Sequence, residues 1–496
     1  MMASYILVVD QSTSGTKALV VDRSGAIVGK SAAEHKQYYP KPGWVEHDIL
    51  EIYDNVKRTA QQALAAAGIR PEQLAALTLT NQRETAVLWD RTTGLPVHRA
   101  IVWQCQRTAD RCAAYKAAGH EAAVQAKTGL MLDPYFSAAK WGWMLEESEE
   151  VQEKLDQGVL LAGTVDSYLL WRLTGGAVHA TDYTNASRTS LFNIHTLQWD
   201  EEMCALFGVP QELLPEVRYS DELFGYTADE ELFAAKVPIS GIIGDSQAAL
   251  FGHLCLQPGM AKATYGTGTS VLMNVGEQPV ASGNGLVSAI AWGMNGRVTY
   301  ALEAVIRTSG DSIKWVRDNL GLFDTFDELN ELLHQAPNNE GVYLVPAFVG
   351  MGAPYWNPYA RAAIIGMSRG TGKAHIVRAA IESIAYQVCD AAELMLQESG
   401  IALRELRTDG GASDNPLLMQ FQADLLRQTV VKSKVAELSA MGAVYMGGLG
   451  TGFWPGSEAL ANLPTAYMRY EPQMEEVARA ELYAGWKQAV GRIVQE

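Results

Sequence analysis

The sequence predicts an α/β protein built from two related domains that face each other across a central cleft. Short apolar strands alternate with helical patterns along all 496 residues, which is typical of α/β folds. A strand–turn–strand whose turn is rich in Gly, Ser and Thr occurs near the start of the chain and again about half a chain later. The length is sufficient for two or more large cores. We place one domain at residues 1–247 and the second at 248–496, with the boundary at a helix expected over 247–252.

The first hairpin has a carboxylate at the end of its leading strand. The apolar strand 5–9 ends at Asp10, and the turn 11–17 leads directly into further strands at 18–22 and 26–29. Nucleotide sites of the strand–loop–helix type place phosphate on a helix N-terminus, and no helix follows here. Turn amides and hydroxyls would bind phosphate instead, which favours an actin- or hexokinase-like (ribonuclease H-like) ATPase core. Asp, Ser and Gly also make ordinary hairpin turns, so the hairpin alone leaves both interpretations open.

The second hairpin repeats this arrangement. Strands at 261–265 and 270–275 flank the turn Gly266-Thr267-Gly268-Thr269. Apolar segments at 285–290 and 296–302 continue it, and we expect them to form a β-meander with the hairpin. Two such hairpins indicate a duplicated domain, with each turn large enough for a phosphate.

A third Gly-rich segment, 409–415, follows a strand at 405–408 and precedes a helical pattern. Its two glycines would let the backbone approach a flat ligand such as adenine or its ribose. Ser413 or Asp414 can equally be the N-cap of the following helix. The segment Gly370-Thr371-Gly372-Lys373 lacks the other residues of a P-loop, and 447–452 follows a helical pattern, so we expect a helix-terminating loop there.

Composition excludes several classes of partner. A formal net charge of −17 argues against binding to nucleic acid or an anionic membrane, since both select clustered Lys and Arg. The five cysteines are scattered and never form a Cys-x-x-Cys pair, which predicts reduced thiols and no structural zinc. We find no signal peptide and no apolar segment of the roughly 20 residues that a membrane helix needs. We therefore expect a cytoplasmic protein without membrane insertion.

Two further strand ends carry polar side chains, where α/β proteins place ligand sites. The strand 76–80 runs into Asn81-Gln82-Arg83-Glu84, and the strand 239–244 runs into Asp245-Ser246. Arg83 and Glu84 offer donors and acceptors suited to vicinal hydroxyls, but a solvated turn with a surface ion pair explains them equally. Asp245 can be a helix N-cap, and the aromatic residues Trp103 and Tyr135 are by default core residues.

A more specific signal is spread over nearly the whole chain. It lies in segments 39–48 (YPKPGWVEHD), 80–85 (TNQRET), 101–105 (IVWQC), 163–166 (GTVD), 181–189 (TDYTNASRT), 352–356 (GAPYW) and 362–382, the last with Gly366, His375 and Glu382. These segments resemble the glycerol kinases of the FGGY family of carbohydrate kinases. The resemblance implies a kinase that uses ATP and Mg²⁺ to phosphorylate a primary hydroxyl of glycerol, giving sn-glycerol 3-phosphate and ADP.

The resemblance also implies roles for individual residues. The polyol would be held by Arg83, Glu84, Trp103, Tyr135, Asp245 and Ser246, with Asp245 also the general base. Mg²⁺ would lie at Asp10 and Asp245. The nucleotide and its phosphates would be contacted by Thr13, Ser14, Lys17, Thr267, Gly310, Lys314, Gly411 and Asn415. The small-molecule polyol is the expected partner, and homo-oligomers (dimers or tetramers) are common in the family.

Several residues depart from the family pattern. Lys17 stands where Arg is usual and lacks its planar fork. Ser246 replaces a Gln and Ser270 a Phe, which enlarges and polarises the polyol pocket. A larger polyol or a tetrose-like ketose is therefore an alternative substrate, with Arg307 as a new donor, although bridging water can also compensate for such changes.

A hypothesis from another class is a non-catalytic ATP clamp of the actin or Hsp70 type. The Asn-Gln-Arg-Glu loop at 81–84 and the potential base Asp245 weigh against it, because both make sense with a hydroxylated small molecule.

Overall fold

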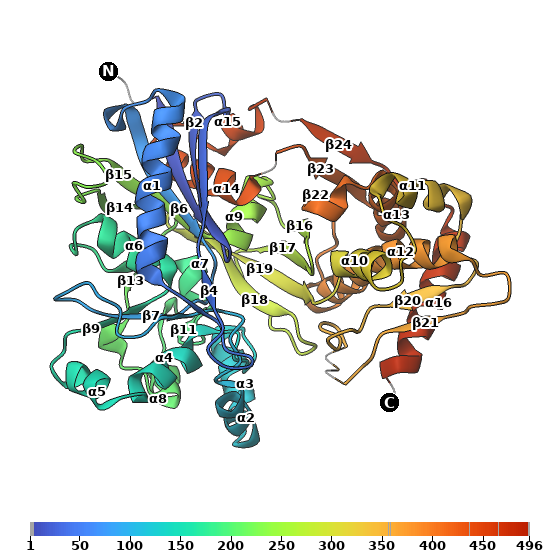
Figure 1. Cartoon of the computed structure of the whole chain (residues 1–496), viewed down its shortest axis with the longest axis horizontal. Helices are drawn as coiled ribbons and strands as arrows, with labels where there is room; N and C mark the ends of the chain where they lie inside the picture. Colours follow the sequence, from blue (N-terminus) through green and yellow to red (C-terminus); the bar gives the residue numbers. More distant parts are fainter. Residues whose placement is uncertain (1–3, 356, 358, 436, 465, 495–496) are drawn as a thin grey trace.

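The computed structural model describes residues 4–355, 357, 359–435, 437–464 and 466–494, which form two lobes (Figure 1). Each lobe is built on a mixed β-sheet, of six strands in the first half of the chain and seven in the second. This two-domain α/β architecture confirms the predicted fold class.

The first sheet has the strand order β14-β15-β6-β1-β2-β3. β1, β2 and β3 form an antiparallel meander, and β6 and β15 run parallel to β1. The strands are β1 (Tyr5–Gln11), β2 (Gly15–Asp22), β3 (Ile27–Glu34), β6 (Leu74–Asn81), β14 (Leu223–Tyr226) and β15 (Pro238–Gly244). The helices α1 (Ile49–Ala67) and α6 (Val165–Leu173) share a core with this sheet.

The second sheet repeats this pattern over five strands, in the order β19-β17-β16-β22-β23. β16, β22 and β23 are parallel, and β17 and β19 continue antiparallel. The strands of the whole sheet are β16 (Met260–Tyr265), β17 (Thr269–Gly276), β18 (Val287–Met294), β19 (Arg297–Ile306), β22 (Glu405–Asp409), β23 (Thr429–Ser433) and β24 (Tyr467–Tyr470). The shared order supports the predicted duplication.

The predicted β-meander is wrong in one respect. β17 pairs with β19, and β18 lies beyond β19 at the edge of the sheet. β18 and β19 are joined by the two residues Asn295 and Gly296, both at positive φ (52° and 74°). Asn-Gly is the preferred sequence for such a tight hairpin turn, so β18 and β19 pair with each other. β19 then pairs with β17 on its other side, which leaves β18 at the edge of the sheet.

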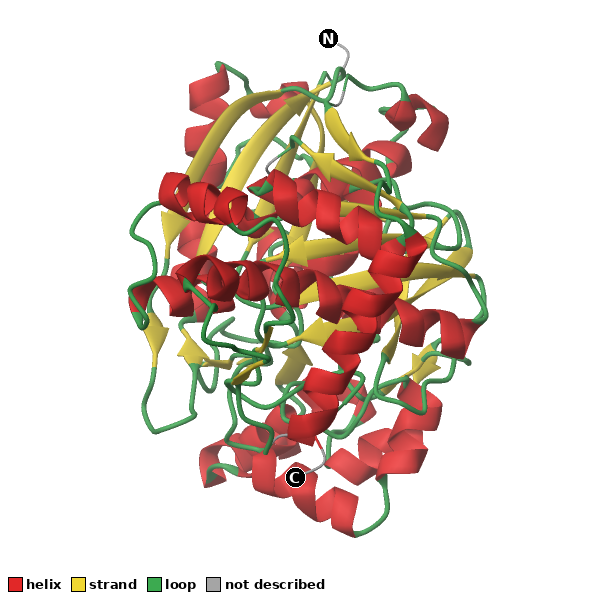
Figure 2. Ribbon diagram, turned by 90° about the vertical axis from the view of Figure 1, so that its right-hand side faces the viewer, coloured by secondary structure: helices red, strands yellow, loops and turns green. Residues whose placement is uncertain are grey.

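Helices cover the outer face of the second lobe, in front of its sheet in Figure 2. They are α10 (Gly310–Asp318), α11 (Phe326–Gln335), α12 (Lys373–Ser399), α13 (Pro416–Leu426) and α16 (Glu476–Val494). Helices of this group pack on the second sheet in the largest hydrophobic cluster of the described residues. Close to them lies a two-stranded antiparallel sheet of β20 (Tyr343–Val345) and β21 (Ala363–Ile365).

Shorter elements form the lower part of the first lobe in Figure 1. The strands are β4 (Gln37–Tyr38), β5 (Glu46–His47), β7 (Val87–Asp90), β8 (Ala100–Ile101), β9 (Leu160–Gly163), β10 (Ala180–Asp182), β11 (Phe192–Asn193), β12 (Gln198–Trp199) and β13 (Glu216–Arg218). The helices are α2 (Ala109–Ala117), α3 (Glu121–Thr128), α4 (Ser137–Glu146), α5 (Glu149–Asp156), α7 (Tyr183–Ala186) and α8 (Glu201–Phe207).

Two helices lie between the sheets: α9 (Asp245–Gly252) and α14 (Leu438–Gly450). α14 packs on β1, β6 and β15, and α9 also contacts β16, β17 and β18. The helices touch through backbone, because a Cβ on Gly442 would lie 1.8 Å from the carbonyl oxygen of Ala248. The loop predicted at 447–452 is therefore wrong for its first residues, which belong to α14, and Gly447 packs against Thr78 and Ser240. The short helix α15 (Ser457–Ala461) follows.

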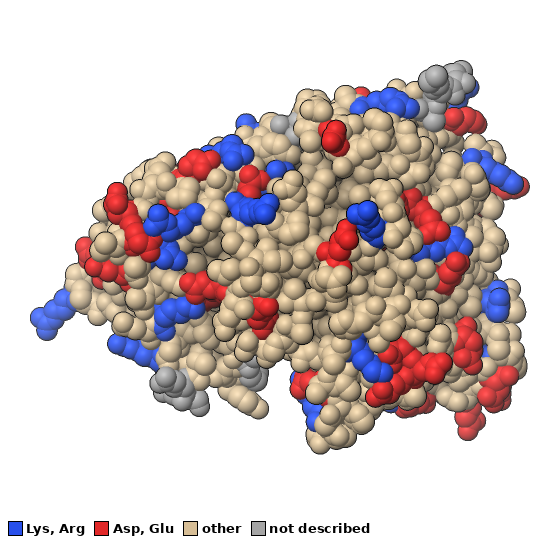
Figure 3. Space-filling model, turned by 180° about the vertical axis from the view of Figure 1, so that it is seen from behind, with Lys and Arg blue, Asp and Glu red and all other residues tan. Residues whose placement is uncertain are grey.

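The surface carries mixed charge. On the face seen in Figure 3, basic side chains are scattered among acidic ones, and acidic groups gather at the lower right. All five cysteines are buried free thiols. Within the described residues, none of the helices combines the length and apolar character needed to cross a bilayer.

We expect Gly442→Ala to destabilise the protein, because its Cβ must displace the backbone of α9. Overpacking of this kind lowers the free energy of unfolding by about 1–3 kcal/mol, which urea unfolding followed by circular dichroism would measure. Gly491→Ala in α16 is the matched control: its Cβ would meet open space, and we expect it to be neutral or stabilising by up to about 1 kcal/mol. Equal stability of the two variants would contradict the backbone contact.

Candidate active site

A cleft of about 940 Å³ lies between the two lobes. The first half of the chain contributes Thr13, Arg83, Glu84, Trp103, Tyr135, Asp245 and Ser246 to its lining, and the second half contributes Lys262, Thr264, Thr267, Ser270, Glu303 and Arg307, among others. The structure thus brings together the predicted polyol residues and two of the predicted phosphate residues, Thr13 and Thr267.

Arg83 and Glu84 follow the carboxyl end of β6 and are almost fully buried, with side chains only 5% and 2% exposed. The alternative of a solvated surface turn is therefore wrong. Glu84 has a left-handed backbone (φ 61°), which a residue with a side chain rarely adopts. Such strain persists where the surroundings fix the residue, and here the Glu84 carboxylate accepts a hydrogen bond of 2.6 Å from Arg188 Nε.

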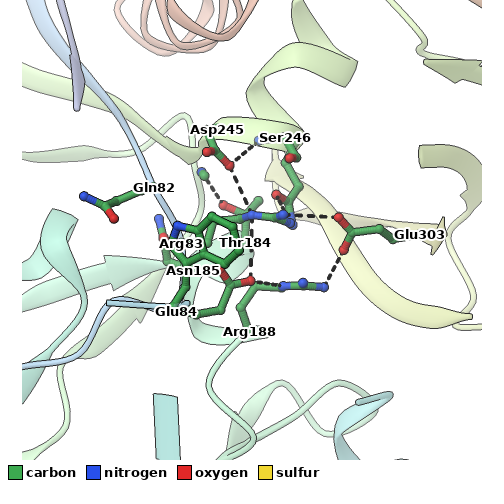
Figure 4. A network of polar contacts seen from close by, with 12 residues as sticks. Gln82, Arg83, Glu84, Thr184, Asn185, Arg188, Asp245, Ser246 and Glu303 are labelled. Carbon is green, nitrogen blue, oxygen red and sulfur yellow. Dashed lines mark hydrogen bonds and ion pairs between the residues drawn. The ribbon is translucent and has the colours of Figure 1, made fainter. Parts of the chain in front are cut away.

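A network of buried charges forms the floor of the cleft (Figure 4). Arg83 Nε lies 3.1 Å from Asp245 Oδ1, and Arg83 Nη2 donates to Glu303 Oε1 at 3.1 Å. Arg188 Nη1 forms an ion pair of 2.6 Å with the other Glu303 oxygen. Glu303 lies on β19 in the second half of the chain, whereas Arg83 and Arg188 belong to the first. The network therefore joins the two lobes.

The electrostatics of this network depend on Glu303. Burial alone raises the pKa of Glu303, but Arg188 and Arg83 outweigh burial and hold it at about 2. The pKa of Glu84 is raised, because burial outweighs the opposing effect of the two arginines. Both arginines stay charged, since their pKa values are raised by these carboxylates against the effect of burial.

Asp245 is the first residue of α9 and lies at the mouth of this network. The N-cap of α9 is Gly244, so the N-cap alternative for Asp245 is wrong. Its side chain is 37% exposed in the cleft. Arg83 Nε and the Ser246 amide, at 2.6 Å, both contact Oδ1. Among the described residues, the second carboxylate oxygen is therefore the one left to face a ligand.

Trp103 and Tyr135 form an aromatic wall of the cleft. Their ring centroids are 5.3 Å apart in an edge-to-face arrangement. The Trp103 indole donates a hydrogen bond of 3.0 Å to Thr13 Oγ1, which ties this wall to the first hairpin. An apolar wall opposite a charged floor suits a small molecule with a carbon chain and several hydroxyls.

The other residues predicted in the first hairpin lie outside the lining of the cleft. Asp10 ends up buried, and burial raises its pKa to about 7, with Lys17 opposing and Asp245 adding to the shift. Lys17 Nζ lies 2.8 Å from Glu437 Oε2 at the start of α14. Ser14 is exposed on the turn.

The Gly-rich segments of the second lobe meet near the turn that follows β16. The amide of Gly310, at the start of α10, donates to Gly266 O at 3.0 Å. Gly410 (φ 86°) lies against the backbone of Tyr265, so its lack of a side chain serves this close packing. Gly411 faces open space, where a ligand can approach, and Lys314 is exposed one turn into α10.

The N-cap of α13 is neither Ser413 nor Asp414, as the sequence suggested, but Asn415. The Asn415 side chain accepts from the Leu418 amide at 3.0 Å. Its amide nitrogen lies 3.4 Å from Asn330 Oδ1. Asn415 is therefore the N-cap of α13, and its predicted contact with the nucleotide stays a prediction.

Sequence reasoning missed Arg188, Gln247, Lys262 and Glu303 as site residues. Lys262 and Glu303 are charged residues in the middle of apolar strands, at 260–265 and 297–306. A charged residue in the middle of an apolar strand is the sequence signal that could have identified Lys262 and Glu303. Lys and Glu side chains are rarely buried without a partner or a function.

We expect Glu303→Gln to destabilise the unliganded protein by about 3–5 kcal/mol, because two buried arginines lose their shared carboxylate. Glu277→Gln is the matched control, since Glu277 pairs with Arg297 on an exposed hairpin, where about 0–1 kcal/mol is usual. Thermal unfolding would measure both. The pKa of Glu303 is about 2 in the fold, so its stabilisation is present above pH 4.5 or so and declines as pH falls towards 2. A gap between wild type and variant that widened on acidification would contradict this assignment.

Known proteins resemble the chain along its whole length. Residues 5–252 match the N-terminal domain of the FGGY family of carbohydrate kinases, and residues 261–451 match the C-terminal domain. Glycerol kinase 2 of Thermotoga maritima is 50% identical over 488 residues, covering 98% of each chain. A glycerol kinase of Caldanaerobacter subterraneus is 49% identical over 494 residues, which is 100% of this chain and 99% of the relative.

A solved structure agrees with these matches. The crystal structure of Plasmodium falciparum glycerol kinase with ADP superposes with a TM-score of 0.94 at 36% identity, covering 99% of this chain and 98% of that one. A gluconate kinase from Lactobacillus acidophilus, 20% identical with a TM-score of 0.89, shares the fold. With both family domains matched in order and a cleft between them, the chain belongs to the FGGY family of carbohydrate kinases.

Proposed function

We propose that this protein transfers the γ-phosphoryl group of ATP to a primary hydroxyl of glycerol, giving sn-glycerol 3-phosphate and ADP. Full-length identity of about 50% to glycerol kinases supports this reaction. The observation within the chain that carries it is the placing of Asp245: a partly exposed carboxylate, oriented by Arg83, in a cleft that both lobes line.

Glycerol is proposed to bind against the first lobe. The Trp103–Tyr135 wall would contact its carbon chain, and Arg83 and Glu84 would hydrogen-bond its hydroxyls. Arg83 is already fixed by Glu303, Asp245 and Gln247. Because its guanidinium cannot reorient, the bound hydroxyls would be held in one place. The reacting hydroxyl would then stay aligned for attack on the γ-phosphorus.

Asp245 is proposed to act as the general base. As the hydroxyl oxygen forms its bond to the γ-phosphorus, the bond from that phosphorus to the ADP oxygen breaks, and the hydroxyl proton passes to the Asp245 carboxylate. Arg83 Nε and the Ser246 amide hold Oδ1, so Oδ2 would take the proton.

The nucleotide is proposed to lie along the second lobe. The hydroxyl and amides of the Thr267 turn and the hydroxyl of Thr13 would contact the phosphates, from opposite sides of the cleft. Gly310 and Gly411 would line the nucleoside site, with Lys314 and Asn415 nearby. Ser14 and Lys17 would join the phosphates when the lobes close, which also excludes water from ATP.

Asp10 and Asp245 fit a Mg²⁺ ion, with Asp245 reaching it through a bound water because its Oδ2 is proposed to face the acceptor hydroxyl. Mg²⁺ is usually bound by one or two carboxylates together with phosphate oxygens and water, and no cluster of three or more metal-ligating side chains occurs within the residues that the structure describes. Burial raises the pKa of Asp10, and the nearby Asp245 adds to it, which a cation between them would relieve. When bound, Mg²⁺ neutralises charge on the phosphates.

The proposal includes three further features of the protein. These are the domain boundary at 247–248, a homo-oligomer of two or four copies, and a cytoplasmic location. A kinase for a larger polyol or ketose is the second candidate, because Ser246 and Ser270 both line the cleft.

The proposed function is tested by measuring ADP release with ATP and Mg²⁺ in the presence and absence of glycerol. We expect release to depend on glycerol and its product to be sn-glycerol 3-phosphate, because closure around ATP excludes water. ADP release that no polyol or sugar increases would reject the kinase and favour the ATP clamp.

We expect Asp245→Asn to lower kcat by roughly 10²–10⁴, the range for loss of a general base, while ATP binding measured by calorimetry persists. Asp110→Asn, an exposed carboxylate in the first turn of α2, is the control and should match wild type. Near-normal turnover of Asp245→Asn would rule out the assigned base.

A further inference from the structure

The reaction proposed above leaves one buried charge in the cleft without a role. Lys262 lies on β16 with only 1% of its surface exposed, and its side chain lines the cleft. Its ammonium donates to Thr264 Oγ1 at 3.0 Å and lies 3.5 Å from Ser270 Oγ. No carboxylate among the described residues lies within 4.0 Å of it.

The sheet places the Lys262 ammonium close to the residues proposed to bind glycerol. Lys262 is opposite Leu272 on β17, and Leu272 is opposite Glu303 on β19. Ser270 fills the space between the two charges, because its hydroxyl lies 3.3 Å from Glu303 Oε1. Glu303 in turn binds Arg83. A continuous row of polar groups therefore leads from the residues proposed to bind glycerol to Lys262.

Lys262 has hydrogen-bonding capacity to spare. An ammonium carries three donors, and two neutral hydroxyls are its nearest partners. Burial of a charge with such weak compensation is unfavourable, and burial lowers the pKa of this lysine although Asp409 and Glu303 oppose it. An oxygen atom of a bound ligand would complete its coordination.

The charges of the site select a neutral ligand. Three cations of the row, Arg83, Arg188 and Lys262, have formal charges that cancel those of Glu84, Asp245 and Glu303, and the Asp409 carboxylate adds a further negative charge that acts on Lys262. A sugar acid would add an unbalanced negative charge near Glu303. A hydroxyl or carbonyl oxygen satisfies the ammonium without one.

We infer that Lys262 and Ser270 form a second polar subsite, which binds a hydroxyl or carbonyl oxygen of neutral polyols or ketoses longer than three carbons. This inference rests on the proposed kinase reaction and extends its range of acceptors. Lys262 is then a specificity-determining residue: glycerol leaves the subsite to water, whereas a four-carbon acceptor reaches it.

The test pairs one hydroxyl of the acceptor with one side chain of the protein. Erythritol or threitol carries the distal hydroxyl, and 1,2,3-butanetriol has the same carbon chain without it. For wild type we expect kcat/KM to be roughly 10–100-fold higher for one of the tetritols than for butanetriol, the usual effect of a hydrogen bond to a charged group. In Lys262→Met this preference should shrink to within about threefold, giving a coupling between hydroxyl and lysine.

Other variants keep the test interpretable. Ser270→Val tests the same subsite without removing a charge, and should also reduce the tetritol preference if Lys262→Met does not fold. Lys116→Met, on the exposed face of α2, should behave as wild type with every acceptor. Circular dichroism and thermal unfolding establish that each variant is folded.

The outcomes separate the two proposals. Turnover of glycerol with none of the tetritols would overturn the second subsite and leave the kinase intact. An equal loss for tetritol and butanetriol in both Lys262→Met and Ser270→Val would overturn it as well, by showing that these residues act on the fold or on the phosphoryl group. No turnover of any acceptor would remove the proposed function itself.

Discussion

Glu303 is the residue on which the rest of the cleft depends. Its carboxylate, supplied by the second sheet, lies between Arg83 and Arg188 from the first half of the chain. All three side chains are removed from water, so leaving any one unpaired would cost several kcal/mol. The two halves of the site therefore keep one relative position at the floor of the cleft, and the same Arg83 that binds Glu303 orients the proposed base Asp245.

The glycine contacts between α9 and α14 also hold the two halves of the site in one relative position. Backbone touches backbone at Gly442 and Ala248, so the two helices cannot come closer or shift past each other at this point without a clash. α9 begins at Asp245, and α14 begins beside Glu437, which forms ion pairs with Lys17 of the first hairpin and Lys30 of β3. The elements that carry the proposed base and the first phosphate turn therefore both contact the pair of helices α9 and α14.

The polar side chains of the second sheet bear on which acceptor is bound, and not on the type of reaction. The reaction type rests on similarity to glycerol kinases over the full length, and Asp245 and the two facing turns are proposed to carry it out. The acceptor depends on a few side chains on the inner face of β16, β17 and β19, where Lys262, Ser270 and Glu303 form a polar row. Acceptor preference is therefore argued from the side chains that line the cleft of this chain.

The amino-acid pattern by itself determined the α/β class, the two hairpins with their turns, and the polar residues at strand ends, because strand period and turn chemistry are local properties. It also predicted Arg83, Trp103, Tyr135 and Asp245 as neighbours, by resemblance. Only the tertiary structure decided that β19 lies beside β17 and that Arg188 and Glu303 complete the floor of the cleft. Glu303 lies 220 residues from Arg83 along the chain, and no local pattern records a contact over that separation. That contact forms because buried charges must be paired, and only the folded sheets bring these two side chains together.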